Sequence, residues 1–199
     1  MYFICRLISQ FTMKEKRNKI KNAALVLFVK RGFHNTPTSL IAKEAGVATG
    51  TLFHYFKTKE ELINTLYLEI KDEMVVALAE KLDQHETIKA KMKQLFFNAV
   101  TWAVEMPEQQ SFFMQFSNSP FIDKLTREEG QERFSGIFAV IEEGKNTDVL
   151  KKIPTPLMFE ILQGMFNGTI NYFLENKVEP DGQNKLEEVF PVFWDAIRG

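Results

Sequence analysis

The segment spanning residues 16–62 constrains the fold of this chain most, because its apolar residues and glycines are spaced for short helices. Ile20, Leu27 and Phe28 recur at helical spacing and predict an amphipathic first helix. Gly32 follows at the place where a helix commonly ends in a left-handed residue. We therefore expect the first helix to stop there.

Two further short helices are predicted directly after it. Thr36 is predicted to cap the second helix, and Pro37 suits its first turn, where an N–H would have no partner. A glycine then turns the chain into a third helix over about 49–56. Two short helices joined in this way form a helix-turn-helix motif, here at about 37–56, whose second helix enters the major groove of DNA.

Positive charge is concentrated in this part of the chain. Residues 14–59 contain ten Lys or Arg against Glu15 and Glu44, a balance of +8, whereas residues 60–199 have a balance of −10. Several of the cations lie in the first turns of the first helix, where they oppose its dipole. DNA phosphates are the expected partners of these cations. The alternative is a solvated N-terminal face.

The run TPTSLIAKEAGVATGTLFHYFKTKEEL resembles the DNA-binding domain of the TetR (tetracycline repressor-like) family of bacterial regulators. The resemblance extends without a gap from Lys14 to roughly Ile70. It implies an all-α fold, in which a three-helix helix-turn-helix domain precedes a larger helical bundle for ligand binding and dimerisation. Carried over by position, it implies DNA contacts from Thr38, Thr49, Gly50, Thr51, Phe53, His54, Tyr55 and Lys59.

Several of these residues also suit DNA contact on physical grounds. Gly50 has no side chain, so the third helix can bring its backbone close to the phosphates. The Thr51 hydroxyl can bond a base edge, and its methyl can pack on thymine. His54, Tyr55 and Lys59 are expected to hold phosphates. For His54 and Tyr55, packing against the first helix is the alternative. The remaining apolar residues of this helix are assigned to the core; they are Leu52 and Phe56.

Three positions depart from the family's pattern. Ala48 stands where the family usually has a capping Ser, so the third helix is predicted to start without a side-chain cap. Thr49 stands where Lys is frequent, and Phe53 replaces a common Tyr. These changes imply weaker or differently specified DNA binding, without loss of function.

The sequence divides into three parts. Residues 1–13 form an N-terminal arm that we expect to be frayed or to precede a natural start at Met13. The only cysteine, Cys5, lies there, which excludes an intramolecular disulfide. Residues 14–74 form the DNA-binding domain, and residues 75–199 form the C-terminal domain.

Helices and loops are expected throughout the second half of the chain. Thr58 and Glu61 form a capping box that begins a fourth helix, which runs into the seventies. Proline residues punctuate the helices that follow. The predicted ranges are about 87–104, 107–117, 120–145, 155–175 and 183–197.

The C-terminal domain is rich in aromatic residues and Met. Core packing is the default role for any one of them, but helical bundles also bind small ligands in apolar cavities. The family resemblance implies such a cavity, for an apolar or amphipathic ligand. The candidate ligand contacts are the apolar Trp102, Phe113, Phe116, Phe138 and Met165 and the polar Gln115, Asn118 and Asn167.

The last two helices are expected to form a homodimer interface. Gly164 and Gly168 lie four residues apart on one helical face, where their cost in helix stability suggests close approach of another helix. Close packing within one subunit is the alternative. The final helix contributes an apolar stripe, formed by Phe190, Phe193, Trp194 and Ile197. Paired helix-turn-helix units would read a pseudo-palindrome.

No enzyme pattern stands out. The three histidines, His34, His54 and His85, lie apart, and we expect no metal, no cofactor and no membrane partner. A cytoplasmic location is expected. The preferred function is a ligand-responsive repressor, which binds operator DNA as a homodimer and is released by its ligand. The alternative is a helical binding module that has kept the fold but lost productive DNA binding.

Overall fold

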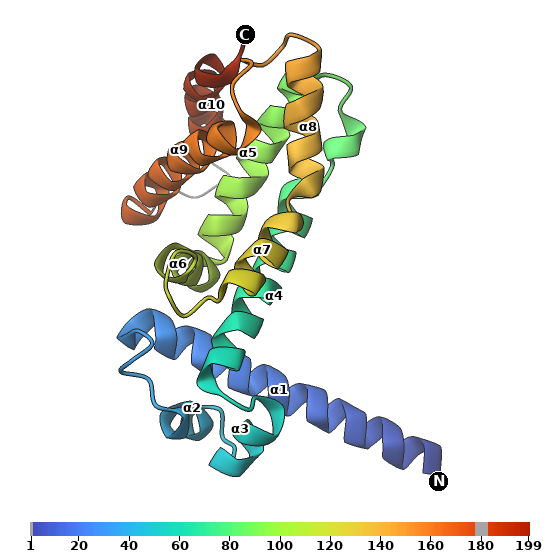
Figure 1. Ribbon diagram of the computed structural model, residues 1–199, viewed down its shortest axis with the longest axis vertical. Coiled ribbons are helices and arrows are strands. Elements are labelled where there is room, and N and C mark those ends of the chain that lie inside the picture. Colours follow the sequence, from blue (N-terminus) through green and yellow to red (C-terminus); the bar gives the residue numbers. More distant parts are fainter. Residues whose placement is uncertain (1, 178–182) are drawn as a thin grey trace. The chain divides into compact units, whose positions relative to one another are not determined.

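The chain is all-α in the computed structural model shown in Figure 1, which describes residues 2–177 and 183–199. Side chains are described for residues 13–177 and 185–199. The helices are α1 (Tyr2–Arg31), α2 (Thr38–Glu44), α3 (Thr49–Tyr55), α4 (Lys59–Ala79), η1 (Leu82–Gln84), α5 (Ile88–Glu105), α6 (Pro107–Phe116), α7 (Lys124–Glu132), α8 (Ser135–Asn146), α9 (Thr155–Glu175) and α10 (Gln183–Ile197). The predicted fold class is confirmed.

The helices form two compact units that are not contiguous in sequence. The first unit contains the residues up to Ile70 together with Glu108–Glu128, and the second contains Lys71–Pro107 and Glu129–Gly199. The sequence division at residue 74 did not include the segment Glu108–Glu128 in the DNA-binding part. This segment joins the first unit because its aromatic rings pack there.

Two ring contacts of α6 show this packing. The Phe116 ring lies 6.1 Å from that of Phe28 in α1, and the Phe113 ring lies parallel to that of Tyr67 in α4 at 6.3 Å. All four side chains are buried. Burial also raises the pKa of the Tyr67 hydroxyl, against an opposing effect of the Arg127 charge.

The predicted helix over 120–145 is wrong, because two shorter helices occupy this range. Asp123 caps α7: its Oδ1 accepts the Thr126 N–H at 2.8 Å, so the helix begins at Lys124. A turn at Arg133 and Phe134 then separates α7 from α8. The Phe134 ring is buried there and meets the edge of the Phe159 ring at 5.5 Å.

The start of α2 also differs from the prediction. Thr36 does not cap it: its buried hydroxyl donates to the carbonyl oxygens of Gly32 at 2.8 Å and Leu27 at 3.2 Å. Pro37 takes the capping position instead, with an extended backbone. The left-handed ends at Gly32 (φ 74°) and Gly46 (φ 66°) are confirmed.

The N-terminal segment can be compared with its prediction only in part. The backbone of residues 2–12, which we set apart as an arm, belongs to α1. Their side chains, including that of Cys5, lie outside the described residues. The expectation about the natural start of the chain stays a prediction.

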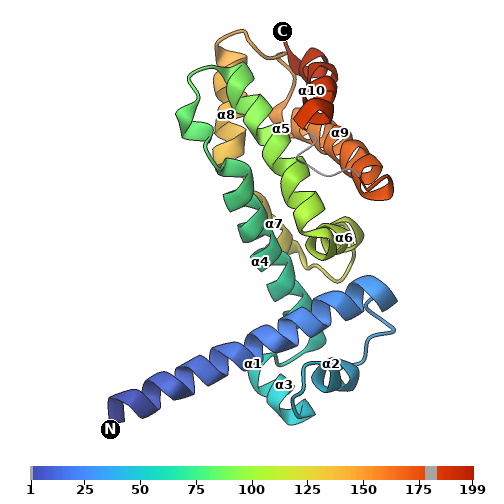
Figure 2. The same ribbon diagram turned by 180° about the vertical axis from the view of Figure 1, so that it is seen from behind.

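Helix α5 lies at the centre of the second unit. Figures 1 and 2 show it with α8 on one side and with α9 and α10 on the other. The Phe193 ring of α10 lies 5.1 Å from both Phe96 and Phe166, and Phe190 packs on Phe96 at 6.0 Å. Within residues 2–177 and 183–199, no helix combines the length and apolar character needed to cross a bilayer.

Candidate nucleic-acid interface

The helix-turn-helix is closed by backbone hydrogen bonds and a small apolar core. The Val47 N–H donates to the Ala42 carbonyl at 2.9 Å, which turns the chain from α2 into α3. Ile41 of α2 and Leu52 of α3 are fully buried, and Phe56 is nearly so. The assignment of Leu52 and Phe56 to the core is confirmed.

The other face of α3 is open. Thr49, Gly50, Phe53 and His54 are exposed, and Thr51 and Tyr55 are half-buried. The six α3 residues predicted to contact DNA therefore have accessible surface. Thr38, at the first position of α2, is also half-buried.

Gly50 has no structural reason to be glycine within the part of the chain that is described. A Cβ built on it would meet no described atom within 4 Å, and its backbone is helical. Glycine inside a helix costs about 0.5–1 kcal/mol relative to Ala. An outside surface that approaches the backbone of α3 closely would explain this residue.

The backbone at the start of α3 agrees with the departure noted at Ala48. This residue occupies the capping position with an extended backbone, and no described side chain caps the helix. The expected capping box of α4 is present in a modified form. Thr58 Oγ1 accepts the Glu61 N–H at 3.0 Å, while the Glu61 carboxylate accepts the Lys57 N–H at 2.6 Å.

Part of the positive charge of α1 is engaged within the first unit. Arg17 donates to the Glu69 carboxylate at 2.9 Å and lies over the Phe56 ring at 5.2 Å, and Lys21 pairs with the same carboxylate. Lys19 pairs with Glu15 at 2.7 Å, which lowers the pKa of that carboxyl. These pairs were not predicted, because α2 and α3 separate Glu69 of α4 from α1 in the sequence.

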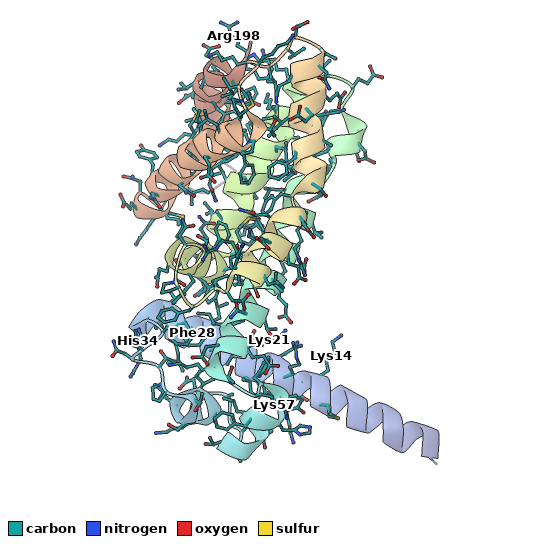
Figure 3. All side chains as sticks on the ribbon, in the orientation of Figure 1. Lys14, Lys21, Phe28, His34, Lys57 and Arg198 are labelled. Atoms are coloured by element: carbon teal, nitrogen blue, oxygen red, sulfur yellow. The ribbon has the colours of Figure 1, made fainter. Side chains whose placement is uncertain are left out.

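Other cations remain open at this end of the chain. Lys14 and Lys16 in α1, Lys43 in α2 and Lys57 before α4 are exposed. Figure 3 labels Lys14 and Lys57, which lie on the α1 and α3–α4 parts of the first unit. Their side chains are therefore accessible to phosphates.

Lys59 is used differently from the predicted phosphate contact. Its ammonium group donates to the carbonyl oxygens of Phe33 at 2.8 Å and Thr36 at 3.2 Å and lies 4.0 Å from the centre of the Phe33 ring. Burial lowers the pKa of this lysine, against an opposing effect of the Glu60 charge. Two of the three N–H donors are thus engaged in holding the turn between α1 and α2.

Comparison with known proteins agrees with this architecture. The family model described as "Bacterial regulatory proteins, tetR family" matches residues 20–66. A solved tetR family transcription regulator from Shewanella sp. PV-4 is 34% identical, with a TM-score of 0.85, over 92% of this chain and 98% of that chain. The chain belongs to the TetR family.

Other relatives match less completely. A TetR family transcription regulator from Marinobacter aquaeolei VT8 shares the fold at 20% identity, with a TM-score of 0.87 over 95% of this chain and 98% of that one. The "Fatty acid metabolism regulator protein" of Bacillus subtilis (strain 168) is 37% identical over 83 residues, which are 40% of this chain and 43% of that protein. The chain thus matches less than half the length of the first curated relatives.

The candidate ligand contacts of this TetR-family protein divide between the two units. Phe113, Gln115, Phe116 and Asn118 lie in the first unit, and Trp102, Phe138, Met165 and Asn167 lie in the second. In the first unit, Phe113 and Phe116 are core residues, and the exposed Gln115 donates to the Val29 carbonyl at 3.4 Å. In the second unit Trp102 is buried, and Phe138 meets the edge of Phe159 at 5.0 Å. Their contact with a ligand stays a prediction.

The candidate dimer residues separate into two groups. Phe190, Phe193, Trp194 and Ile197 are buried within the second unit. They therefore belong to the core of the TetR-family chain itself, because the rings of α10 are needed to cover α5. Gly164 and Gly168 of α9 are exposed, and a Cβ on either would meet no described atom within 4 Å. Close packing of these two glycines within one subunit does not occur among the described residues.

Proposed function

We propose that this protein is a transcriptional regulator that binds double-stranded operator DNA through α3 and is released by a small apolar or amphipathic molecule. The open face of α3 around Gly50 is the observation that carries the proposal. It is a helix of the right length to enter a major groove, with hydroxyl, imidazole and phenol groups on the accessible side. Membership of the TetR family supports the same function.

A homodimer is part of this proposal, with the second copy placed against α9. Five exposed residues of α9 follow one another at helical spacing: Leu157, Ile161, Gly164, Gly168 and Tyr172. Leu157, Ile161 and Tyr172 are between 41% and 52% exposed, which is unusual for large apolar residues aligned on one face. Between them, the two glycines would allow the backbone of a neighbouring helix to come close.

The effector class is proposed from the relatives. A curated relative regulates fatty acid metabolism, and a regulator from Bacillus subtilis that shares the fold at 21% identity was solved with stearoyl-CoA. Long acyl chains are amphipathic once they carry a head group, as the predicted effector is. Stearoyl-CoA is therefore the first effector to test.

DNA binding is tested by selecting operators from random duplexes and from the DNA upstream of the protein's own gene. Gly50→Gln should abolish operator binding while leaving the fold intact, because a Cβ at this position meets no described atom within 4 Å and the longer side chain would block approach to DNA. Gly136→Gln is the matched control, since this exposed helical glycine also has no described neighbour within 4 Å. Full operator binding by Gly50→Gln would contradict the proposed orientation of α3.

The same selection distinguishes the regulator from the alternative, a helical binding module that has lost productive DNA binding. A helical binding module without DNA binding would enrich no operator from either pool. It would still bind stearoyl-CoA or another amphipathic molecule in a calorimetric titration.

A further inference from the structure

The connection between α6 and α7 belongs to the first unit and packs on the turn after α1 through an aromatic residue, Phe121. Its ring stacks on Phe33 with the centroids 4.0 Å apart and the planes 19° from parallel. His34 meets the edge of the same ring at 5.0 Å. Figures 1 and 2 both show this connection close to the C-terminal end of α1, where Figure 3 labels His34.

Asn64 of α4 holds the backbone directly after this ring, on both sides of Ile122. Its amide nitrogen donates to the Phe121 carbonyl at 3.0 Å, and its side-chain oxygen accepts the Asp123 N–H at 3.1 Å. The Asn64 amide thus makes one donor and one acceptor hydrogen bond to the connection, as a peptide group of a neighbouring strand would. The same amide nitrogen also donates to the Glu60 carbonyl at 2.8 Å, which fixes its orientation on α4.

Phe33 lies at the point from which the helix-turn-helix begins. It belongs to the turn between α1 and α2, and its carbonyl accepts a hydrogen bond from Lys59 at 2.8 Å. The next contact of that lysine, Thr36, ties the turn back to α1 through its buried hydroxyl. Helix α2 starts two residues after Thr36, so a displacement of Phe33 would change the position of the first turn of α2.

We propose that Phe121, held by Asn64, is a positioning residue for DNA recognition, which fixes the start of α2 through its stacking on Phe33. This inference rests on the proposed DNA-binding function and deepens it. The α6–α7 segment enters from the second unit at Pro107 and returns to it at Glu129.

The first test measures amide hydrogen exchange in the full chain without DNA. Phe121→Ala should speed exchange in the turn 33–36 and in α2 by about 3- to 10-fold, the range expected for loss of one stacked aromatic pair. Exchange in α5 and α9 should not change. Phe121→Tyr keeps the stacked ring and should restore slow exchange, whereas Leu125→Ala removes a 71% exposed apolar side chain of the same segment and should have no effect.

The second test measures affinity for an operator selected by the wild-type protein and for random duplex DNA. Phe121→Ala should weaken operator binding by about 3- to 10-fold and leave random binding unchanged, because phosphate contacts do not depend on the exact placement of α2. Asn64→Ala should act in the same direction. The double variant should bind operator no more weakly than the more affected single variant, since both substitutions disturb the placement of the same ring.

The outcomes separate the two proposals. If the wild-type protein selects no operator, the proposed function fails, and the exchange data alone decide the role of Phe121. If operator binding is normal in Phe121→Ala, or if exchange in α2 is unaltered, the positioning role is overturned. Equal losses for operator and random DNA would also overturn it, because they would indicate general destabilisation of the first unit.

Discussion

At the residue scale, Thr51 and Lys59 occupy opposite situations in the helix-turn-helix. Thr51 is half-buried on α3, one residue before the fully buried Leu52, so it lies at the border between the core and the open face. Lys59 contacts main-chain carbonyls and a ring of its own unit. A side chain that contacts a base and one that stabilises a turn should respond differently to substitution. The first should change operator affinity, and the second should change thermal stability.

Thr51→Ala should weaken operator binding by about 1–3 kcal/mol and leave binding to random DNA nearly unchanged, because the hydroxyl and methyl are predicted to read bases. The melting temperature should stay the same. Fluorescence anisotropy with labelled operator and random duplexes measures both affinities. An equal loss for the two DNAs would make Thr51 a backbone contact, and unfolding would contradict its place outside the core.

Lys59→Met should reduce thermal stability and leave the salt dependence of DNA binding unchanged, because its ammonium holds the turn between α1 and α2. Lys57→Met is the matched control, since the exposed Lys57 should contact a phosphate. Its loss should flatten the log–log dependence of affinity on salt by about one unit. If the salt dependence of Lys59→Met were also flattened, Lys59 would contact a phosphate, as the family resemblance implied.

At the element scale, a glycine that needs its small size lies in α8. A Cβ on Gly144 would lie 2.5 Å from Leu150 Cδ1 and 3.0 Å from Ile88 Cγ2, both in buried side chains. Gly164 and Gly168, by contrast, face open space in the described chain. Close packing within the subunit and the proposed contact between subunits therefore fall on different helices.

Gly144→Ala should lower the free energy of unfolding by about 1–3 kcal/mol, because overpacking against Leu150 outweighs the gain in helix propensity. Gly136→Ala in the same helix has no described neighbour within 4 Å and should be neutral or stabilising. Denaturant unfolding of both variants makes the comparison. Equal stability of the two variants would mean that Leu150 moves aside at little cost.

Ile161→Asp should convert the proposed dimer to a monomer, because the charge would be placed in the centre of the α9 face. Val76→Asp is the control: this residue of α4 is 74% exposed, so an added charge there should not change the assembly. Sedimentation velocity over a range of concentrations measures both. An unaltered dimer in Ile161→Asp would exclude α9 as the contact surface.

At the scale of the whole molecule, α4 contributes residues to both units. It runs from Lys59 to Ala79, and the units divide at Ile70 and Lys71. In the second unit, the Arg133 guanidinium donates to Asp72 at 2.5 Å, and the adjacent Lys71 lies 5.1 Å from the centre of the Phe134 ring. Consecutive residues of α4 thus contact consecutive residues of the turn between α7 and α8.

Arg133→Ala should reduce the effect of an effector on DNA binding, because it uncouples α4 from that turn. With stearoyl-CoA as the effector, the ratio of operator affinities without and with effector should move toward one, by about 0.5–2 kcal/mol of coupling. Arg133→Lys, which keeps the charge beside Asp72, should retain part of the ratio. An unchanged ratio in Arg133→Ala would show that the contact with Asp72 does not transmit the effect.

Local sequence patterns determined the elements of the helix-turn-helix. The spacing of apolar residues and glycines was enough for the end of α1, for α2 and α3, and for the start of α4, because helix periodicity and left-handed ends are properties of neighbouring residues. The missing side-chain cap of α3 could also be predicted, because it depends only on the residue at position 48. The face of α3 could be assigned since burial of Leu52 leaves its neighbours outside.

Only the tertiary structure decided which polar groups and aromatic rings find partners far along the chain. Lys59 turned inward to Phe33 and Thr36, and Asn64 bonded to the backbone beside Phe121, over separations that no periodic pattern encodes. The rings of α10, which the sequence suggested for a dimer, pack on α5. A helical stripe shows that a face is apolar, but what covers it depends on how the other helices fold around it.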